Sequence, residues 1–264
     1  MQGKIHNYIS TKVGTPSTKF ISTPGQLPTS AALTTTHIYT STKRGVVLPI
    51  SLDTMAKPKK SYGKEHHKGE LLCIAASEDG KYLVSAGRDK LLGVWDISGA
   101  EPVWKHGIPG HKDAVTSVVI PPVGNPSHHL LSASLSRHLG LHSLSTLSII
   151  DTFFGHQDSI TSVSALKPSV AVTAGSRDRT CRWWKVEEEV QLVFRGVGKT
   201  FEGAKGLAEE EKKESPGGGY YPGEEPAEKP KFDKKGKRKE FVEGSLDTVC
   251  VLDEQHFLSG GDSG

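Results

Sequence analysis

Histidine, serine and aspartate recur along this 264-residue chain in an order that would suit nucleophilic catalysis. His67, Ser85 and Asp89 form the clearest set, and Trp95 follows the aspartate by six residues. In a hydrolase triad the histidine takes the proton of the serine hydroxyl, and the carboxylate orients the imidazole. A catalytic site needs to occur only once in a chain, so the first question is whether this set repeats.

The spacing of the aspartate and the tryptophan does repeat. Asp178 lies 89 residues after Asp89 and precedes Trp184 by the same six residues. The distance is about twice the 40–45 residues of a propeller blade, so we expect a degenerate copy in between. The segment LLSASLSRHLGLHSL supplies that copy, with Ser136 at the aspartate position and His142 at the tryptophan position.

Other features keep the same period. Gly110-His111 and Gly155-His156 are 45 residues apart, and each precedes a short apolar run. Upstream, IYTSTKRGVVLPISL places Arg44 and Ile50 in the aspartate and tryptophan positions, and FLSGGDSG restarts the turn at Ser263. Each unit therefore reads as four short antiparallel strands, which is one blade of a β-propeller.

One polar set in each blade indicates a structural role rather than a catalytic centre. The middle copy keeps its histidine and serine but lacks the aspartate and tryptophan, and in the last copy Ala174 stands at the serine or threonine position. We predict that the following residues hold the blades together: His67, Ser85, Asp89, Trp95, His111, Ser132, His156, Asp178 and Trp184.

Composition excludes several classes of protein. The net charge is +3, and Cys73, Cys181 and Cys250 form no CxxC pair, so neither a disulfide scaffold nor a zinc site is indicated. The chain has no apolar run of membrane-spanning length and no phosphate-binding glycine loop, HExxH helix or nucleophile elbow. We expect an intracellular protein with no catalytic residues, metal, cofactor, small-molecule substrate or membrane contact.

The expected fold is all-β, a partial propeller of about four blades plus the start of a further one. Because the chain stops where a strand would be left unpaired, we expect it to be a fragment or an unfinished gene model. The predicted segments are 1–20 before the propeller, 21–52 a degenerate blade, 53–70 a basic linker, 71–109 a blade, 110–154 a degenerate blade, 155–198 a blade, 199–244 a disordered insertion rich in Lys, Glu, Pro and Gly, and 245–264 the truncated start of the next blade.

Two basic clusters are candidates for contact with phosphate. The cluster in the linker is the predicted RNA-binding site, and it comprises Lys57, Lys59, Lys60, Lys64 and Lys68. The cluster that closes the insertion is predicted to serve nuclear import or phosphate contact, and it comprises Lys234, Lys235, Lys237, Arg238 and Lys239. A solvated loop that keeps the chain soluble is the alternative for the second cluster.

Several stretches resemble the WD-repeat proteins of the U3 small nucleolar ribonucleoprotein. They include LLCIAASEDGKYLVSAGRDK, FFGHQDSITSVSAL and, most specifically, VTAGSRDRTCRWWKVEEEVQLVF. The resemblance implies a non-catalytic platform in the nucleolus that binds U3 small nucleolar RNA and proteins of the small-subunit processome during pre-ribosomal RNA processing.

Two other functions compete with this one. A general WD-repeat adaptor, such as a ubiquitin-ligase substrate receptor or a chromatin subunit, would share the blades but not the long run at 172–194. An enzyme built on a propeller would need one unrepeated group of acid, base or metal ligands, and the sequence shows none.

Overall fold

A computed structural model describes residues 21, 25–54, 56, 58, 60–99, 101–122, 124–125, 127–195, 245–253 and 256–261. Within these residues all regular structure is β, arranged in five antiparallel sheets. The predicted all-β fold class is confirmed. Each sheet is an up-and-down meander in which the strands pair in chain order.

The first sheet has three strands, β1 (Pro28–Leu33), β2 (His37–Thr42) and β3 (Val47–Ser51). Three four-stranded sheets follow: β4 (Leu71–Ala76), β5 (Tyr82–Gly87), β6 (Leu91–Asp96) and β7 (Val103–Pro109); β8 (Val115–Val119), β9 (His129–Ser134), β10 (His138–Ser143) and β11 (Ser148–Phe154); β12 (Ile160–Lys167), β13 (Val170–Gly175), β14 (Thr180–Lys185) and β15 (Val190–Arg195). A two-stranded sheet, β16 (Leu246–Val251) and β17 (Phe257–Gly261), comes last.

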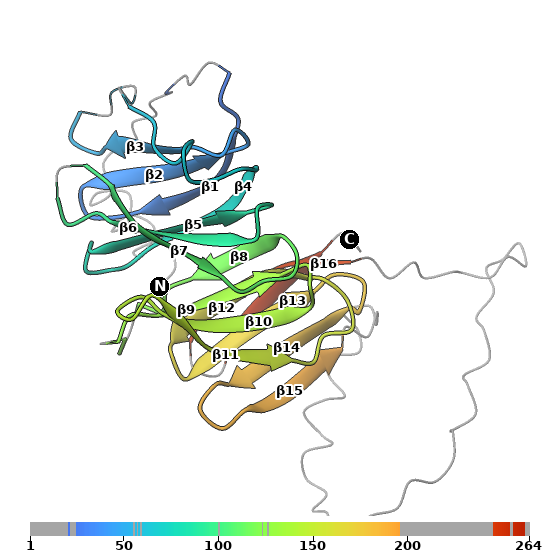
Figure 1. The fold of residues 1–264 in the computed structure, drawn as a ribbon. Helices are drawn as coiled ribbons and strands as arrows, with labels where there is room; N and C mark the ends of the chain where they lie inside the picture. Colours follow the sequence, from blue (N-terminus) through green and yellow to red (C-terminus); the bar gives the residue numbers. More distant parts are fainter. Residues whose placement is uncertain are drawn as a thin grey trace, which may run out of the picture.

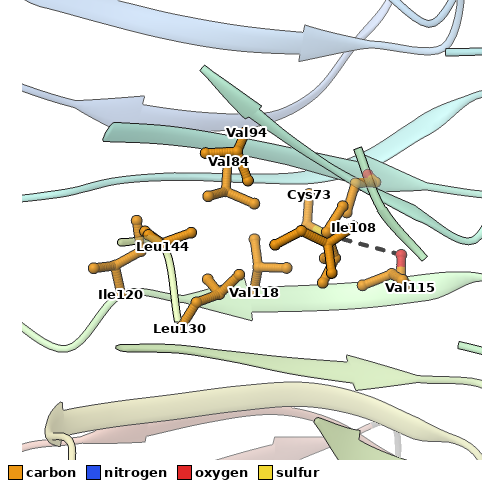
Figure 2. Close-up of a cluster of buried hydrophobic side chains, with 11 residues drawn as sticks. Cys73, Val84, Val94, Ile108, Val115, Val118, Ile120, Leu130 and Leu144 are labelled. Carbon is orange, nitrogen blue, oxygen red and sulfur yellow. Dashed lines mark hydrogen bonds between the residues drawn. The ribbon is translucent and has the colours of Figure 1, made fainter. Parts of the chain in front are cut away.

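The sheets stack face to face in chain order, and apolar layers fill the spaces between them (Figure 1). Successive side chains of a strand point to opposite faces, so a strand covered on both sides must be apolar at consecutive positions. In β5, Leu83 packs toward the first sheet and Val84 toward the third, and both are fully buried. Figure 2 shows Val84 and Val94 meeting Val118 and Leu130 across one such layer.

The innermost strands β4, β8, β12 and β16 are joined, each to the next, by a side-chain contact to a backbone carbonyl. Thr116 Oγ1 donates to the carbonyl of Ile160 at 2.7 Å, and Thr161 Oγ1 donates to that of Leu246 at 2.9 Å. The Cys73 thiol takes the same position and lies 3.8 Å from the carbonyl of Val115 (Figure 2). Burial raises the pKa of this thiol far above its usual range, which suits a structural cysteine.

The first sheet departs from the expected four strands. In place of an outer strand, Tyr62 forms a single antiparallel bridge to Val47, with N···O distances of 2.7 and 2.9 Å. The segment predicted as a basic linker therefore contributes one residue pair to the edge of the first sheet. Tyr62 also packs against the apolar layer between the first two sheets.

Residues 196–244, which include the whole predicted insertion at 199–244, lie outside the described residues. Both flanking strands reach the same hairpin, because Arg195 pairs with Thr180 and the Leu246 amide donates to the carbonyl of Ser176 at 3.2 Å. We therefore predict that replacing residues 203–243 with a short Gly-Ser connection leaves the sheets folded. The test is urea denaturation of the full chain, with and without the replacement. A loss of solubility or of the cooperative transition would show that the segment contributes packing.

Candidate functional site

The first complete polar set is buried between the first and second sheets. His67 Nδ1 lies 2.6 Å from Asp89 Oδ2, and His67 Nε2 lies 2.9 Å from Ser85 Oγ. The indole N–H of Trp95 donates to the same Ser85 oxygen at 2.9 Å. Burial opposes ionisation of Asp89, but the hydrogen bond and charge of His67 outweigh it and lower the pKa of this carboxyl. Ser85 is fully buried and bonded on both sides, so it offers no nucleophile to a substrate.

The fourth sheet repeats this geometry with a different hydroxyl. His156 Nδ1 lies 2.7 Å from Asp178 Oδ2, and His156 Nε2 lies 2.7 Å from Thr173 Oγ1. The Trp184 indole N–H donates to Thr173 Oγ1 at 2.8 Å. The prediction that Ala174 holds this position is wrong. Ala174 faces the opposite side of β13 and packs with the last sheet.

The reason for this difference is one extra residue in the hairpin. Asp89 follows Ser85 by four positions, whereas Asp178 follows Thr173 by five. A count of four positions back from Asp178 therefore reaches Ala174 instead of Thr173. A shift of one residue moves a side chain to the other face of a sheet.

Replacing Thr173 with alanine tests this assignment directly. We expect Thr173→Ala to destabilise the full chain by about 1–3 kcal/mol, because it leaves a buried histidine and an indole without their shared partner. Thr173→Ser keeps the hydroxyl and serves as the matched control. Urea denaturation measures both, and equal losses in the two variants would mean that the methyl group matters rather than the hydrogen bonds.

In the third sheet two histidines share one serine. His111 Nε2 and His142 Nε2 lie 2.6 and 2.8 Å from Ser132 Oγ, so His142 occupies the place of the tryptophan. Ser136, at the aspartate position, bonds only to Ser134 among the described residues. Within the same part of the chain, buried His142 Nδ1 has no hydrogen-bond partner.

Burial keeps both of these histidines neutral. It lowers the pKa of His111 to about 4, with a further effect from the charge of His138. It lowers the pKa of His142 to about 3, with a further effect from His111. The site that lacks its carboxylate therefore holds two neutral histidines.

Three of the five linker lysines, Lys60, Lys64 and Lys68, are among the described residues. Lys60 pairs with Glu101 in the loop between β6 and β7, whereas Lys64 and Lys68 are exposed near the start of β4. Lys57 and Lys59 lie outside the described residues, as do Lys234, Lys235, Lys237, Arg238 and Lys239.

An aromatic contact at the end of the linker was missed from the sequence. The His66 ring stacks on Trp104 with centroids 4.1 Å apart and planes 7° apart, and its edge faces Trp95. The adjacent histidines His66 and His67 were the only sign of this contact in the sequence. Only one of them can enter the polar set, so the other is left for a different partner. The described residues contain neither a group of three potential metal ligands nor a helix able to cross a membrane.

Comparison with known proteins agrees with this geometry. The model of the WD domain, G-beta repeat, matches residues 57–96 and 147–185. The chain is a WD-repeat protein. The second WD match begins just before β11, the outermost strand of the third sheet, and the first begins in the segment that contains Tyr62. The first match thus begins within the predicted linker, whose Tyr62 pairs with the edge of the first sheet.

Several relatives share these WD repeats. Ribosomal RNA-processing protein 9 of Saccharomyces cerevisiae is 35% identical over 201 residues, which are 76% of this chain and 33% of the relative. An uncharacterized WD repeat-containing protein of Schizosaccharomyces pombe is 33% identical over 204 residues, again 76% of this chain and 31% of the relative. U3 snoRNP-associated protein-like EMB2271 of Arabidopsis thaliana is 32% identical over 55% of this chain and 29% of the relative. The WD-repeat chain thus spans about a third of the length of these curated relatives.

Solved structures of WD propellers match as well. The structure of U3-55K superposes with a TM-score of 0.68 at 26% identity, over 92% of this chain and 61% of that one. The crystal structure of RRP9 WD40 repeats gives a TM-score of 0.61 at 30% identity, over 67% of this chain and 54% of that one. The homologues of this WD-repeat chain therefore include U3 snoRNP-associated and rRNA-processing proteins.

Proposed function

We propose that the chain is part of a non-catalytic scaffold of the U3 small nucleolar ribonucleoprotein, which binds U3 small nucleolar RNA and particle proteins during pre-ribosomal RNA processing. Its place of action would be the nucleolus. The observation that carries the proposal is the 35% identity to Ribosomal RNA-processing protein 9 over three quarters of the chain. The likeness to the RRP9 and U3-55K structures supports it.

The polar sets support a scaffold rather than an enzyme. Each triad-like group is shared with an indole or a second histidine and is buried between sheets. A nucleophile must reach its substrate, and none of these hydroxyls does. The repeated groups thus stabilise the blades, and function is left to the outer surface.

The RNA-binding role of the linker remains part of the proposal, as does the import or phosphate-contact role of residues 234–239. Lys60 is the weakest candidate for RNA contact, because Glu101 already neutralises it. Lys64 and Lys68 remain exposed and carry no ion pair among the described residues.

Crosslinking in cells tests the proposed function. The full-length protein that contains this chain would be crosslinked to RNA, purified under denaturing conditions and the bound RNA sequenced. Enrichment of U3 small nucleolar RNA is expected. Recovery of protein partners without this RNA would instead favour a general WD-repeat adaptor.

A further inference from the structure

One end of the stacked sheets carries most of the exposed positive charge. Because strands alternate in direction, the hairpins β2–β3, β5–β6, β9–β10 and β13–β14 lie at the same end as the loops that enter β4, β8 and β12. Hydrogen bonds connect neighbouring parts of this end: Lys90 Nζ donates to the carbonyl of Lys112 at 2.8 Å, and Arg137 donates to that of Gln157 at 3.5 Å. We call this end the hairpin rim.

Exposed cations outnumber exposed acids on the hairpin rim. The exposed acids among its described residues are Glu65, Asp113 and Asp247, while Asp89 and Asp178 are engaged by histidines and Glu70 pairs with Arg88. The exposed cations are Lys43, Arg44, Lys64, Lys68, Arg88, Lys90, Lys112, Arg137, Arg177, Arg179 and Arg195. An unbalanced surface of this kind attracts polyanions.

The opposite end has the reverse balance. Its exposed lysines are each paired with a carboxylate, in the pairs Lys60–Glu101, Lys81–Asp79 and Lys185–Glu188. Its exposed acids are Asp53, Glu78, Asp79, Glu101, Glu187, Glu188, Glu189 and Asp253. The charge of the sheets is therefore polarised, and a polyanion would meet the hairpin rim first.

The third sheet is the most favourable part of this rim for a nucleotide. Ser136 stands where the neighbouring sheets have an aspartate, and no described carboxylate pairs with Arg137 or Lys112. Beside them, the Phe154 side chain is 65% exposed, and its ring lies 4.5 Å from that of His138. Burial lowers the pKa of His138, and so do the charges of Lys112 and Arg137, because both cations lie near this ring.

We propose that this part of the hairpin rim, formed by Lys112, Arg137 and Phe154, binds one nucleotide of a single-stranded RNA. The inference rests on the proposed function and assigns its contact surface. The Arg137 guanidinium and the Lys112 ammonium bind phosphate oxygens, and a planar guanidinium does so with two parallel hydrogen bonds. The exposed Phe154 ring stacks on a base, which every nucleotide offers and an acidic peptide does not.

This assignment gives the degenerate polar set a function. In the second and fourth sheets a carboxylate completes the set and places a negative charge at the turn. Loss of that carboxylate at Ser136 weakens the set but removes a charge that would repel phosphate. Binding and blade stability therefore oppose each other at this position.

Fluorescence anisotropy with a labelled oligouridine of about ten nucleotides tests the surface on the full chain. Arg137→Glu and Phe154→Ala should each weaken binding about tenfold, and Arg137→Glu should also reduce the salt dependence. Lys185→Glu, at the opposite end, is the matched control and should leave binding unchanged. Polyglutamate of equal length should compete poorly, and competition as strong as that of unlabelled oligouridine would assign the surface to an acidic protein and overturn the proposal.

Ser136→Asp separates RNA contact from folding. It should leave the urea midpoint unchanged or raise it, because His111 gains a carboxylate, and yet weaken oligouridine binding about fivefold. Unchanged binding in Ser136→Asp, Arg137→Glu and Phe154→Ala, with the parent binding both oligouridine and U3 RNA, would overturn the rim assignment and leave the proposed function standing. A parent chain that binds no RNA, U3 included, would overturn both.

Discussion

Lowering the pH from 7 to 5 is expected to destabilise the full chain by about 4 kcal/mol through His111 and His142. Burial holds the pKa of these side chains at about 4 and about 3, whereas in the unfolded chain both take up a proton near pH 6.5. Between pH 6.5 and pH 5 the folded state thus binds fewer protons than the unfolded state. The contribution to stability is complete above pH 6.5 and is lost as the pH falls below it. Each histidine contributes about 2 kcal/mol at pH 5. Urea denaturation at the two pH values measures the difference.

The variant His142→Trp is the matched control for this pH dependence. It removes one titrating group and supplies the indole that Trp95 and Trp184 provide elsewhere. The loss between pH 7 and pH 5 should fall by about half. His156, whose pKa burial also lowers, titrates in parent and variant alike and cancels in the comparison. An unchanged pH dependence in the variant would mean that water reaches His142 and keeps its pKa ordinary.

The period of the chain was the part of the fold that sequence alone could predict. The spacing from Asp89 to Trp95 and from Asp178 to Trp184 is fixed by the third strand, because the aspartate precedes that strand by two residues in both sheets. The residue after it is left-handed in each hairpin, with φ of 66° at Lys90 and 54° at Arg179. Spacing from the aspartate forward is therefore reliable, and WD repeats were identified from it.

Spacing backward across the hairpin could not be predicted in the same way. The turn length decides which residue faces the histidine, and the hydroxyl of Thr173 was the one local sign that this residue, not Ala174, belongs to the set. The single bridge at Tyr62 was hidden for a related reason, since an isolated residue pair leaves no alternation to detect. Long-range pairing, not local preference, determines both.

The charge of the hairpin rim was present in the sequence but not interpreted. Each hairpin carries its own basic residues, as in GRDK and SRDR, whereas the linker lysines are recognisable as a group because they lie within one short segment. Only the meander topology shows that these separate hairpins share one end of the stack. The charged rim could therefore be identified only from the fold, whereas the period of the blades could be predicted from the sequence.

Trp184→Ala is expected to cost about 4 kcal/mol of unfolding free energy, the largest loss for one side chain that we predict. Trp184 is only 3% exposed and packs with Ala171 and Val186 against the third sheet, where its ring centre lies 6.0 Å from that of Phe153. Removing the ring opens a cavity that two packed sheets cannot close, and it also takes away the donor to Thr173. Urea denaturation of the full chain gives the value.

Trp184→Phe divides this loss into its two parts. Phenylalanine keeps an aromatic ring in the layer but cannot donate to Thr173, so we expect a loss of about 1–2 kcal/mol. Thr173→Ala removes the same hydrogen bond from the other side, so adding it to Trp184→Phe should cost less than the sum of the two single changes. Full additivity would show that Trp184 and Thr173 act independently, contrary to the 2.8 Å bond between them. Coupling would show instead that the tryptophan spaced six residues after Asp178 links the packing between two blades to the polar set within one.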